Sequence, residues 1–275
     1  MSDAWSRYWA RETSGACLPG APPAIQAILR ETWTGVARAL ADGDRVLDIC
    51  AGAGAALRVL RANRDRLNLT GVDQANVGPD AASFGIRGGI DAHALPFDAA
   101  GFDAVISQFG LEYCGHPAWA EAVRVLKPGG MIRLICHHAD SPAVQHNGRR
   151  LVAMRAMADA GLFALAEAVA SGHGEDPAAA QVLLAAREAH GDQSVVSELP
   201  MALGHWARAR RPDAVAAIRV EAEAEMARLS AMQGAALDAA AMAERLCWLL
   251  PLVVDAAPLV GPDGLPIGWV VRGNR

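Results

Sequence analysis

The feature that most constrains this chain is a buried strand that runs into a glycine turn and then a helix. Residues 45–49 form a short apolar run, and Gly52 and Gly54 follow it closely. Similar short runs alternate with helical stretches as far as residue 137. This alternation is typical of a parallel sheet that is covered by helices on both faces. We therefore expect an α/β fold with a doubly wound sheet.

The same patterns predict the order of the elements. The chain should contain strands at residues 45–49, 68–72, 84–89, 102–107 and 131–136, with a helix over 117–126 that stops at Lys127-Pro-Gly-Gly130. Helices are expected over residues 151–170, 177–190, 212–229 and 235–248, and a closing strand pair over 254–260 and 266–271. We expect an N-terminal helical lid (1–40), a ligand-binding core (41–140), a helical insertion (141–250) and a closing hairpin (251–275).

Composition excludes several classes of protein. Hydrophobic residues make up 52% of the 275 residues and charged ones 20%, which indicates a globular chain and not a disordered one. A formal net charge of −5 disfavours a nucleic-acid partner, which would require a basic surface. No run approaches the roughly 18 apolar residues of a membrane span, so no membrane partner is expected. The cysteines are widely spaced and lack a C-x-x-C pair, which with the absent signal peptide favours the cytoplasm.

The glycine turn predicts a ligand with a negatively charged group. Backbone can approach a ligand closely there, and free helix N–H groups point at an anion, either a pyrophosphate or an amino-acid carboxylate. A dinucleotide fingerprint requires a third glycine where Leu57 stands. Asp48 ends the strand, and its carboxylate would repel a pyrophosphate but suits the ammonium group of a methionine moiety. The alternative is that Gly52 and Gly54 only shape the turn.

Two further acidic residues follow the next strands. Asp73 lies about twenty residues beyond the glycine turn, the spacing at which a carboxylate meets ribose hydroxyls. Asp91 follows the third predicted strand, where a carboxylate beside a backbone N–H can recognise an adenine edge. The alternatives are that Asp73 caps a helix and that Asp91 caps the following turn.

These motifs together resemble a known family. They are Asp48-x-Cys50-x-Gly52-x-Gly54, Gly71-Val-Asp73, Asp91-Ala92 through Leu95-Pro-Phe97, Phe102-Asp103 and Leu126-Lys-Pro-Gly-Gly130. Over about residues 43–137 the chain is similar to class I S-adenosylmethionine-dependent methyltransferases, most closely to the small-molecule group related to ubiquinone-pathway enzymes. Cys50 departs from the family pattern, in which glycine or alanine is more usual.

The resemblance implies a Rossmann-like, seven-stranded sheet whose last strand is antiparallel, with a helical insertion before the closing hairpin. It implies S-adenosylmethionine as cofactor and a small-molecule methyl acceptor. Asp48, Gly52 and Gly54 would hold the methionine end, Asp73 the ribose, and Asp91 with Ala92 the adenine. We place Cys50, Ala51, Gln74 and Gln108 in the same cofactor site.

The acceptor pocket should lie beyond the carboxyl ends of the strands. His137 and His138 are the candidates for acid–base catalysis, because histidine titrates near neutrality. Adjacent residues of an extended chain point to opposite faces, so one of the two is expected to face the pocket. Alternatively, either ring bonds a loop carbonyl, or both act with Asp140 as metal ligands; we expect no metal.

The N-terminus and the insertion are expected to surround the acceptor. Family resemblance suggests that an N-terminal segment folds over the site as a lid, and Trp5, Tyr8, Trp9, Arg11 and Tyr113 are the substrate-binding candidates. The alternative is an aromatic stripe that docks a short helix on the core. The insertion is expected to cap the pocket or to form a homodimer. Competing functions are a non-catalytic binding or assembly protein with this fold and an NAD(P)-dependent oxidoreductase.

Overall fold

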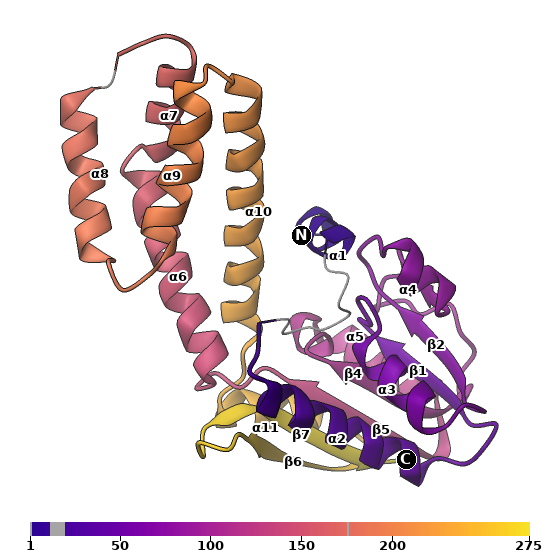
Figure 1. Cartoon of the computed structure of the whole chain (residues 1–275). Helices are drawn as coiled ribbons and strands as arrows, with labels where there is room; N and C mark the ends of the chain where they lie inside the picture. The colour runs from indigo at the N-terminus through magenta and orange to yellow at the C-terminus, as the bar shows by residue number, and fades with distance from the viewer. Residues whose placement is uncertain (1, 12–19, 175) are drawn as a thin grey trace. The chain divides into compact units, whose positions relative to one another are not determined.

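A computed structural model describes residues 2–11, 20–174 and 176–275. Its centre is a seven-stranded sheet in the order β3-β2-β1-β4-β5-β7-β6 (Figure 1). The strands are β1 (Arg45–Ile49), β2 (Asn68–Val72), β3 (Ile86–Arg87), β4 (Phe102–Gln108), β5 (Leu126–Cys136), β6 (Val253–Val260) and β7 (Pro266–Asn274). Strands β1 to β5 pair in parallel, and β7 lies antiparallel to both β5 and β6. This confirms the predicted α/β fold with an antiparallel last strand.

The predicted strand bounds hold best for the first two strands. β1 and β2 begin and end at the predicted residues, whereas β3 is reduced to two residues. β5 begins at Leu126, so residues 127–130 belong to the strand and do not form a separate break. The pairing of β4 with β5 shifts register between Phe102 and Ala104. Proline and glycine are therefore accommodated at the irregular start of this pair.

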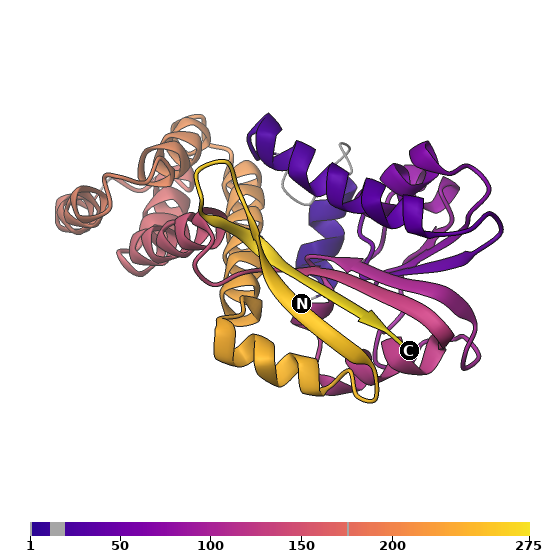
Figure 2. The ribbon, with the colours of Figure 1, turned by 90° about the horizontal axis from the view of Figure 1, so that it is seen from below.

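Helices cover both faces of the sheet (Figure 2). Along β4, Ala104 and Ile106 face α2 (Pro23–Ala39) and α3 (Ala55–Asn63). Val105 faces the opposite side, where α5 (His116–Val125) and α11 (Ala239–Cys247) pack. This two-residue alternation gives the sheet two separate apolar cores. The carboxyl ends of the parallel strands are left as the edge on which polar side chains gather.

The chain divides into two compact units. One contains Met1–Val144 and Gly234–Arg275, and the other contains Gln145–Gln233. The second unit has a core of its own and is built from α6 (Pro142–Asp159), α7 (Leu162–Ala170), α8 (Pro177–Ala189), α9 (Val195–Arg208) and α10 (Pro212–Ala235). The helix predicted over 151–170 is instead two helices, because Gly161 breaks it with a φ of 87°. Helix α9 was not predicted. Within the described residues, no helix has the length and apolarity needed to cross a membrane.

Candidate functional site

The link between β1 and α3 is a tight turn with three residues in left-handed backbone geometry. Cys50, Gly52 and Gly54 have φ angles of 60, 52 and 83°. The Ala51 N–H donates to the Val72 carbonyl at 2.9 Å, and the Gly54 N–H donates to the Ala51 carbonyl at 2.8 Å. The first bond ties the turn to β2 and the second closes it. These hydrogen bonds therefore hold the turn in place without help from a ligand.

Asp73 follows β2 and reaches the glycine turn. Its Oδ2 accepts a hydrogen bond from the Gly52 N–H at 2.8 Å, and its Oδ1 accepts one from the Ala75 N–H at 2.8 Å. Burial raises the pKa of Asp73, and these two bonds oppose the rise. Each oxygen keeps a second lone pair that a ligand hydroxyl can use. The neighbouring Gln74 is exposed at the same edge.

Asp48 is the most deeply buried acid of the turn. It is 2% exposed, and its Oδ1 has no hydrogen-bond partner among the described residues. Burial, and secondly the charge of Asp73, raise the pKa of Asp48 well above its usual value. An unpaired carboxyl oxygen in the interior costs about 1–3 kcal/mol or more. A ligand that donates to this oxygen would remove that penalty.

Asp91 and Ala92 lie in the loop that follows β3. Asp91 Oδ1 accepts from the His93 N–H at 2.9 Å and lies 2.7 Å from His93 Nδ1. The hydrogen bond from the His93 backbone is the main cause that lowers the pKa of Asp91. The Asp91 side chain therefore caps its own turn at the half-exposed rim, while Ala92 is buried beneath it.

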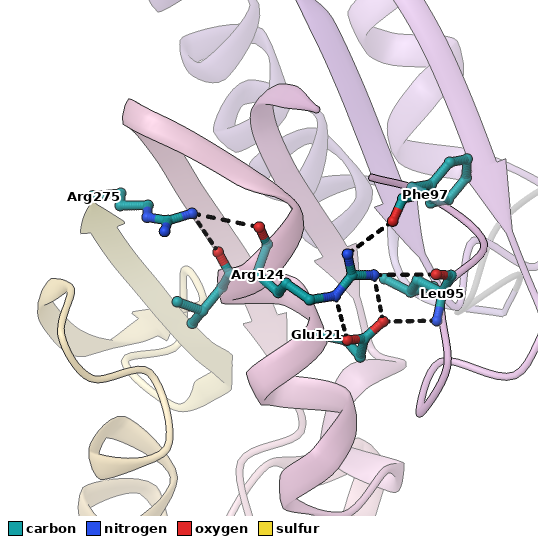
Figure 3. A network of polar contacts seen from close by, with 6 residues as sticks. Leu95, Phe97, Glu121, Arg124 and Arg275 are labelled. Carbon is teal, nitrogen blue, oxygen red and sulfur yellow. Dashed lines mark hydrogen bonds and ion pairs between the residues drawn. The ribbon is translucent and has the colours of Figure 1, made fainter. Parts of the chain in front are cut away.

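An ion-pair network anchors the far end of this loop (Figure 3). Glu121 Oε2 accepts from the Leu95 N–H at 2.8 Å, and Arg124 Nη1 donates to the Phe97 carbonyl at 2.8 Å. The two side chains pair directly, with Arg124 Nη2 and Glu121 Oε2 2.7 Å apart. Arg275 Nη1 donates to the Val123 carbonyl at 3.0 Å on the same helix. Helix α5 thus holds the loop in place, and Arg275 bonds the end of that helix.

Helix α1 (Ser2–Arg11) packs on the glycine turn. A Cβ built at Gly52 would lie 2.3 Å from the Trp9 ring, so only glycine fits beneath this indole. The Ser6 hydroxyl accepts from the Asn76 N–H at 2.9 Å, which ties α1 to the loop after β2. The segment predicted as a lid contains two helices with different contacts. Whereas α1 packs on the glycine turn, α2 packs on the sheet through the buried Trp33.

The aromatic residues of α1 form one cluster with Tyr113. Trp5 lies edge-on to Tyr8 at 5.9 Å and to Tyr113 at 5.5 Å between ring centroids. Tyr113 belongs to the 3-10 turn η1 (Leu111–Tyr113) that follows β4. The cluster thus joins α1 to the end of β4. The side chain of Arg11, also predicted to bind substrate, lies outside the described residues.

Among the predicted cofactor residues, Gln108 is the one whose side chain bonds a helix that packs on the sheet. Gln108 is buried, and its Oε1 accepts a hydrogen bond from the Trp33 indole of α2. This bond holds the Gln108 side chain against α2. The predicted residues brought together at the turn are Asp48, Cys50, Ala51, Gly52, Gly54 and Asp73, with Gln74 exposed at the same edge.

The two adjacent histidines contact different partners. His137 is buried, stacks on Phe109 with ring centroids 4.6 Å apart and lies edge-on to Tyr113 at 5.8 Å. Burial lowers the pKa of His137 to about 4, so the ring is neutral near pH 7. His138 instead stacks on Trp269 of β7 at 4.6 Å. Only His137 therefore belongs to the aromatic cluster of Phe109 and Tyr113.

His138 is engaged by its own loop. Its Nδ1 accepts a hydrogen bond from the Asp140 N–H at 3.0 Å, which leaves the proton of a neutral ring on Nε2. The Asp140 carboxylate is mostly exposed and 4.0 Å from the same nitrogen. In the part of the chain that the structure describes, no group of three His, Cys, Asp or Glu side chains is placed to hold a metal ion.

Glu112 is a site residue that the sequence patterns did not single out. It is 3% exposed, and its Oε1 accepts from the His137 N–H at 2.8 Å. Its Oε2 has no hydrogen-bond partner in residues 20–174, 176–275 or the described part of α1. Burial raises the pKa of Glu112 to about 7. The sequence feature that could have identified Glu112 is its position as an acidic residue between Leu111 and Tyr113, shortly after a buried strand.

Comparison with known proteins identifies the core. Residues 47–134 match the family model described as a methyltransferase domain. The chain is 34% identical over 110 residues to demethylmenaquinone methyltransferase of Clavibacter sepedonicus, covering 36% of this chain and 43% of that protein. It is 30% identical over 133 residues to 2-phytyl-1,4-naphtoquinone methyltransferase of Synechocystis, covering 43% and 53%. The core is a class I S-adenosylmethionine-dependent methyltransferase domain. The chain spans about half the length of these curated relatives.

Among solved structures, the chain is similar to geranyl diphosphate C-methyltransferase of Streptomyces coelicolor. The sequence identity is 20%, the match covers 49% of this chain and 64% of that one, and the TM-score is 0.35.

The residues of the methyltransferase core fit its cofactor. The buried Asp48 oxygen that has no partner among the described residues suits a ligand that donates hydrogen bonds, as an ammonium group does. Asp73 lies beside the glycine turn, and each of its carboxylate oxygens keeps a lone pair that can accept from a ligand. The family match ends at residue 134, so it includes Glu112 and Tyr113. It does not include His137, His138 or α1.

Proposed function

We propose that this chain transfers a methyl group from S-adenosylmethionine to a small molecule with a quinone-type ring. One observation carries the proposal: a buried oxygen of Asp48, which has no hydrogen-bond partner among the residues that the structure describes, lies beside the glycine turn within the segment that matches methyltransferase domains. Both curated relatives are named as methyltransferases of quinone compounds. The rings of Trp5, Tyr113 and His137 give the site apolar faces that suit a planar acceptor.

The cofactor is proposed to lie along the carboxyl edge of β1, β2 and β3. Asp48 would accept from its ammonium group, and the turn at Gly52 and Gly54 would approach its methionine end closely. Asp73 would accept from the ribose hydroxyls and Ala92 would contact the adenine. The Asp91 carboxylate, which bonds His93, would meet the adenine only at the rim of the site.

Methyl transfer requires mainly positioning by the protein. The bound cofactor supplies an electrophilic methyl group. A base is needed where the acceptor must lose a proton, and a base works best when its pKa lies near the working pH. Glu112, with a pKa of about 7, meets this condition better than His137 with a pKa of about 4. We therefore assign the base to Glu112, and to the neutral His137 ring the contact with the acceptor.

The first test is calorimetric titration of the cofactor-free chain with S-adenosylhomocysteine, NADH and NADPH. Micromolar binding of S-adenosylhomocysteine without binding of either nicotinamide is expected. Asp48→Asn should weaken S-adenosylhomocysteine binding by about 10- to 100-fold, because a hydrogen bond to a charged group is worth about 1.5–3 kcal/mol. Binding of a nicotinamide in place of S-adenosylhomocysteine would overturn the proposal.

A matched control separates binding from general damage. Asp103 lies near the amino end of β4, whereas the proposed cofactor site lies at the carboxyl ends of the strands. Its carboxylate accepts from Lys127 Nζ at 2.7 Å and from the Arg45 N–H at 2.9 Å. Asp103→Asn should leave S-adenosylhomocysteine affinity unchanged. Equal losses for Asp48→Asn and Asp103→Asn would mean that Asp48 acts through the fold and not on the ligand.

The helical insertion is proposed to form a homodimer. Several apolar side chains on α8 and α9 are exposed: Val182, Leu184, Met201 and Trp206. Burial of such side chains against a second copy would remove apolar surface from water. Sedimentation velocity tests this, and a monomer at micromolar concentration would rule it out. A cytoplasmic location stays a prediction from the cysteine pattern.

A further inference from the structure

Two cysteines meet at the edge of the cofactor site. Cys50 begins the glycine turn, Cys114 follows η1, and their Sγ atoms are 3.8 Å apart. Both cysteine residues are half-buried. The other described cysteines differ, because Cys136 is buried in the core and Cys247 is exposed on α11. Cys17 lies outside the described residues.

The fold holds this pair together through neighbouring residues. The Ser107 hydroxyl donates to the Ile49 carbonyl at 2.7 Å and accepts from the Leu111 N–H at 3.1 Å. One side chain thus joins the residue before Cys50 to the turn that leads into Cys114. The contact between the thiols is therefore supported by buried hydrogen bonds on both sides.

The glycine at position 110 is also needed for the contact. A Cβ built at Gly110 would lie 2.4 Å from the Cys50 Cβ and 3.0 Å from the Cys50 carbonyl oxygen. The left-handed backbone of Cys50 places its side chain against this gap. Cys50 occupies a position where the resembling family more often has glycine or alanine, and there it meets the second thiol.

We propose that Cys50 and Cys114 are a modification site, at which a peroxide forms a reversible disulfide that cross-links the glycine turn to the segment after η1. The pair is in van der Waals contact, and a disulfide requires the sulfur atoms to approach to about 2.05 Å. Bond formation therefore requires the two side chains to rotate and the turn to shift.

The chemistry balances with hydrogen peroxide as oxidant. The hydrogen bond from Cys50 lowers the pKa of Cys114, so Cys114 is the better thiolate. Its sulfur attacks one peroxide oxygen, the O–O bond breaks, and a sulfenic acid and hydroxide form. Cys50 then attacks the Cys114 sulfur, the S–O bond breaks, and the second oxygen leaves as water. Two thiols and one peroxide give one disulfide and two waters, and a dithiol then reduces the disulfide to the two thiols while it is itself oxidised to a disulfide.

The cross-link should alter the cofactor site, and this consequence rests on the proposed function. Cys50 is adjacent to Ala51 and Gly52, and Gly52 is bonded to Asp73. A shift of the turn moves these groups together. Oxidation is expected to weaken S-adenosylhomocysteine binding by about ten-fold, within the range of coupling found between linked sites.

The first experiment asks only whether the bond forms. The full chain with Cys17→Ser and Cys247→Ser is treated with one equivalent of hydrogen peroxide, alkylated and digested with trypsin. The expected product joins residues 46–58 to residues 88–124 and disappears with dithiothreitol. Adding Cys114→Ser should abolish it. Oxidation of Cys114 to sulfinic acid without the joined peptide, or no oxidation of either thiol, would overturn the proposal.

The second experiment separates this proposal from the function. S-adenosylhomocysteine is titrated into reduced, oxidised and re-reduced protein by calorimetry. Weaker binding only after oxidation, regained with dithiothreitol and absent in the Cys114→Ser variant, is expected. Unchanged affinity of the cross-linked protein would refute the effect on the cofactor. Failure of the reduced protein to bind would refute the proposed function, while the joined peptide would still establish the modification site.

Discussion

At the scale of single residues, Glu112 is the side chain whose protonation is most clearly controlled by burial. Its pKa of about 7 in the folded chain exceeds the usual 4.5, because burial penalises the charged form. The folded state therefore binds the proton more tightly than the unfolded state. The contribution of Glu112 to stability is full below pH 4.5, is lost as the pH rises through 7, and amounts to about 3 kcal/mol.

Glu112→Gln should remove this pH dependence. The amide oxygen can still accept from the His137 N–H, whereas no charge must form in the interior. Relative to the unchanged protein, the variant should gain up to about 3 kcal/mol in free energy of unfolding between pH 4.5 and 7. Urea unfolding at a series of pH values measures this. If Glu112 is the base, turnover falls and its rise with pH disappears, while S-adenosylhomocysteine affinity is kept.

The control for this prediction is Glu31→Gln. Glu31 is exposed and pairs with Arg38 at 2.9 Å, so its removal should change the stability profile little. A Glu112→Gln profile that parallels that of the unchanged protein would contradict the buried, protonated state of Glu112.

Residue contacts were predicted unevenly from sequence. The spacing of Asp73 from the glycine turn predicted that it meets the ribose of the cofactor, whereas its hydrogen bond with Gly52 was not predicted. Glu112 was missed, since a hydrophobic pattern does not indicate that a charged residue within it is buried. The contact of Cys50 with Cys114 was missed as well, because 64 residues separate them and only the packing of β1 beside β4 joins them.

At the scale of elements, α1 is the part whose role depends most on tertiary contact. It is only ten residues long, and so short a helix is marginal unless it packs on a surface. Trp9 covers Gly52 and Trp5 contacts Tyr113, so its aromatic residues hold α1 to the core. Trp9→Ala should weaken S-adenosylhomocysteine binding by about ten-fold, because an indole that anchors a contact is worth more than 1 kcal/mol.

The measurement for α1 is the dissociation rate of S-adenosylhomocysteine by stopped flow. For Trp9→Ala we expect a faster dissociation rate and a nearly unchanged association rate, because the variant loses the indole that covers the bound ligand. Ala10→Ser, at an exposed position of the same helix, is the matched control. Equal rates in both variants and the unchanged protein would show that α1 docks without covering the ligand.

Elements were predictable where local pattern and burial agree. The predicted bounds of β1 and β2 hold, and β1 is buried from Val46 to Ile49. Helix α9 was missed because Pro200 and Gly204 lie inside it, and both residues disfavour helix interiors. Its buried residues Val195, Val196 and Leu203 pack in the core of the second unit, and this packing outweighs local propensity.

At the scale of the whole chain, the two units have separate apolar cores. The sheet of the first unit is covered by α2, α3, α5 and α11, whereas α6 to α10 pack around a core of their own. The family match lies wholly within the first unit. Sequence pattern predicted a helical insertion here, but it did not predict which helices belong to each core, since that depends on long-range packing.

Separate cores predict that a ligand stabilises only the unit that binds it. At 100 times its dissociation constant, S-adenosylhomocysteine should raise the free energy of unfolding of the first unit by about 2.7 kcal/mol. Its slowest amides, in β1, β4 and β5, should then exchange hydrogen about 100-fold more slowly, because their exchange follows global opening.

Hydrogen exchange followed by mass spectrometry measures both units in one sample. Peptides from α7 and α9 are the internal control, and their exchange should not change, because their core excludes the ligand-binding strands. Equal slowing in both units would show instead that the chain unfolds as one cooperative body. In that case stabilisation at the glycine turn would reach the insertion through α6 and α10, the two helices that the boundary between the units crosses.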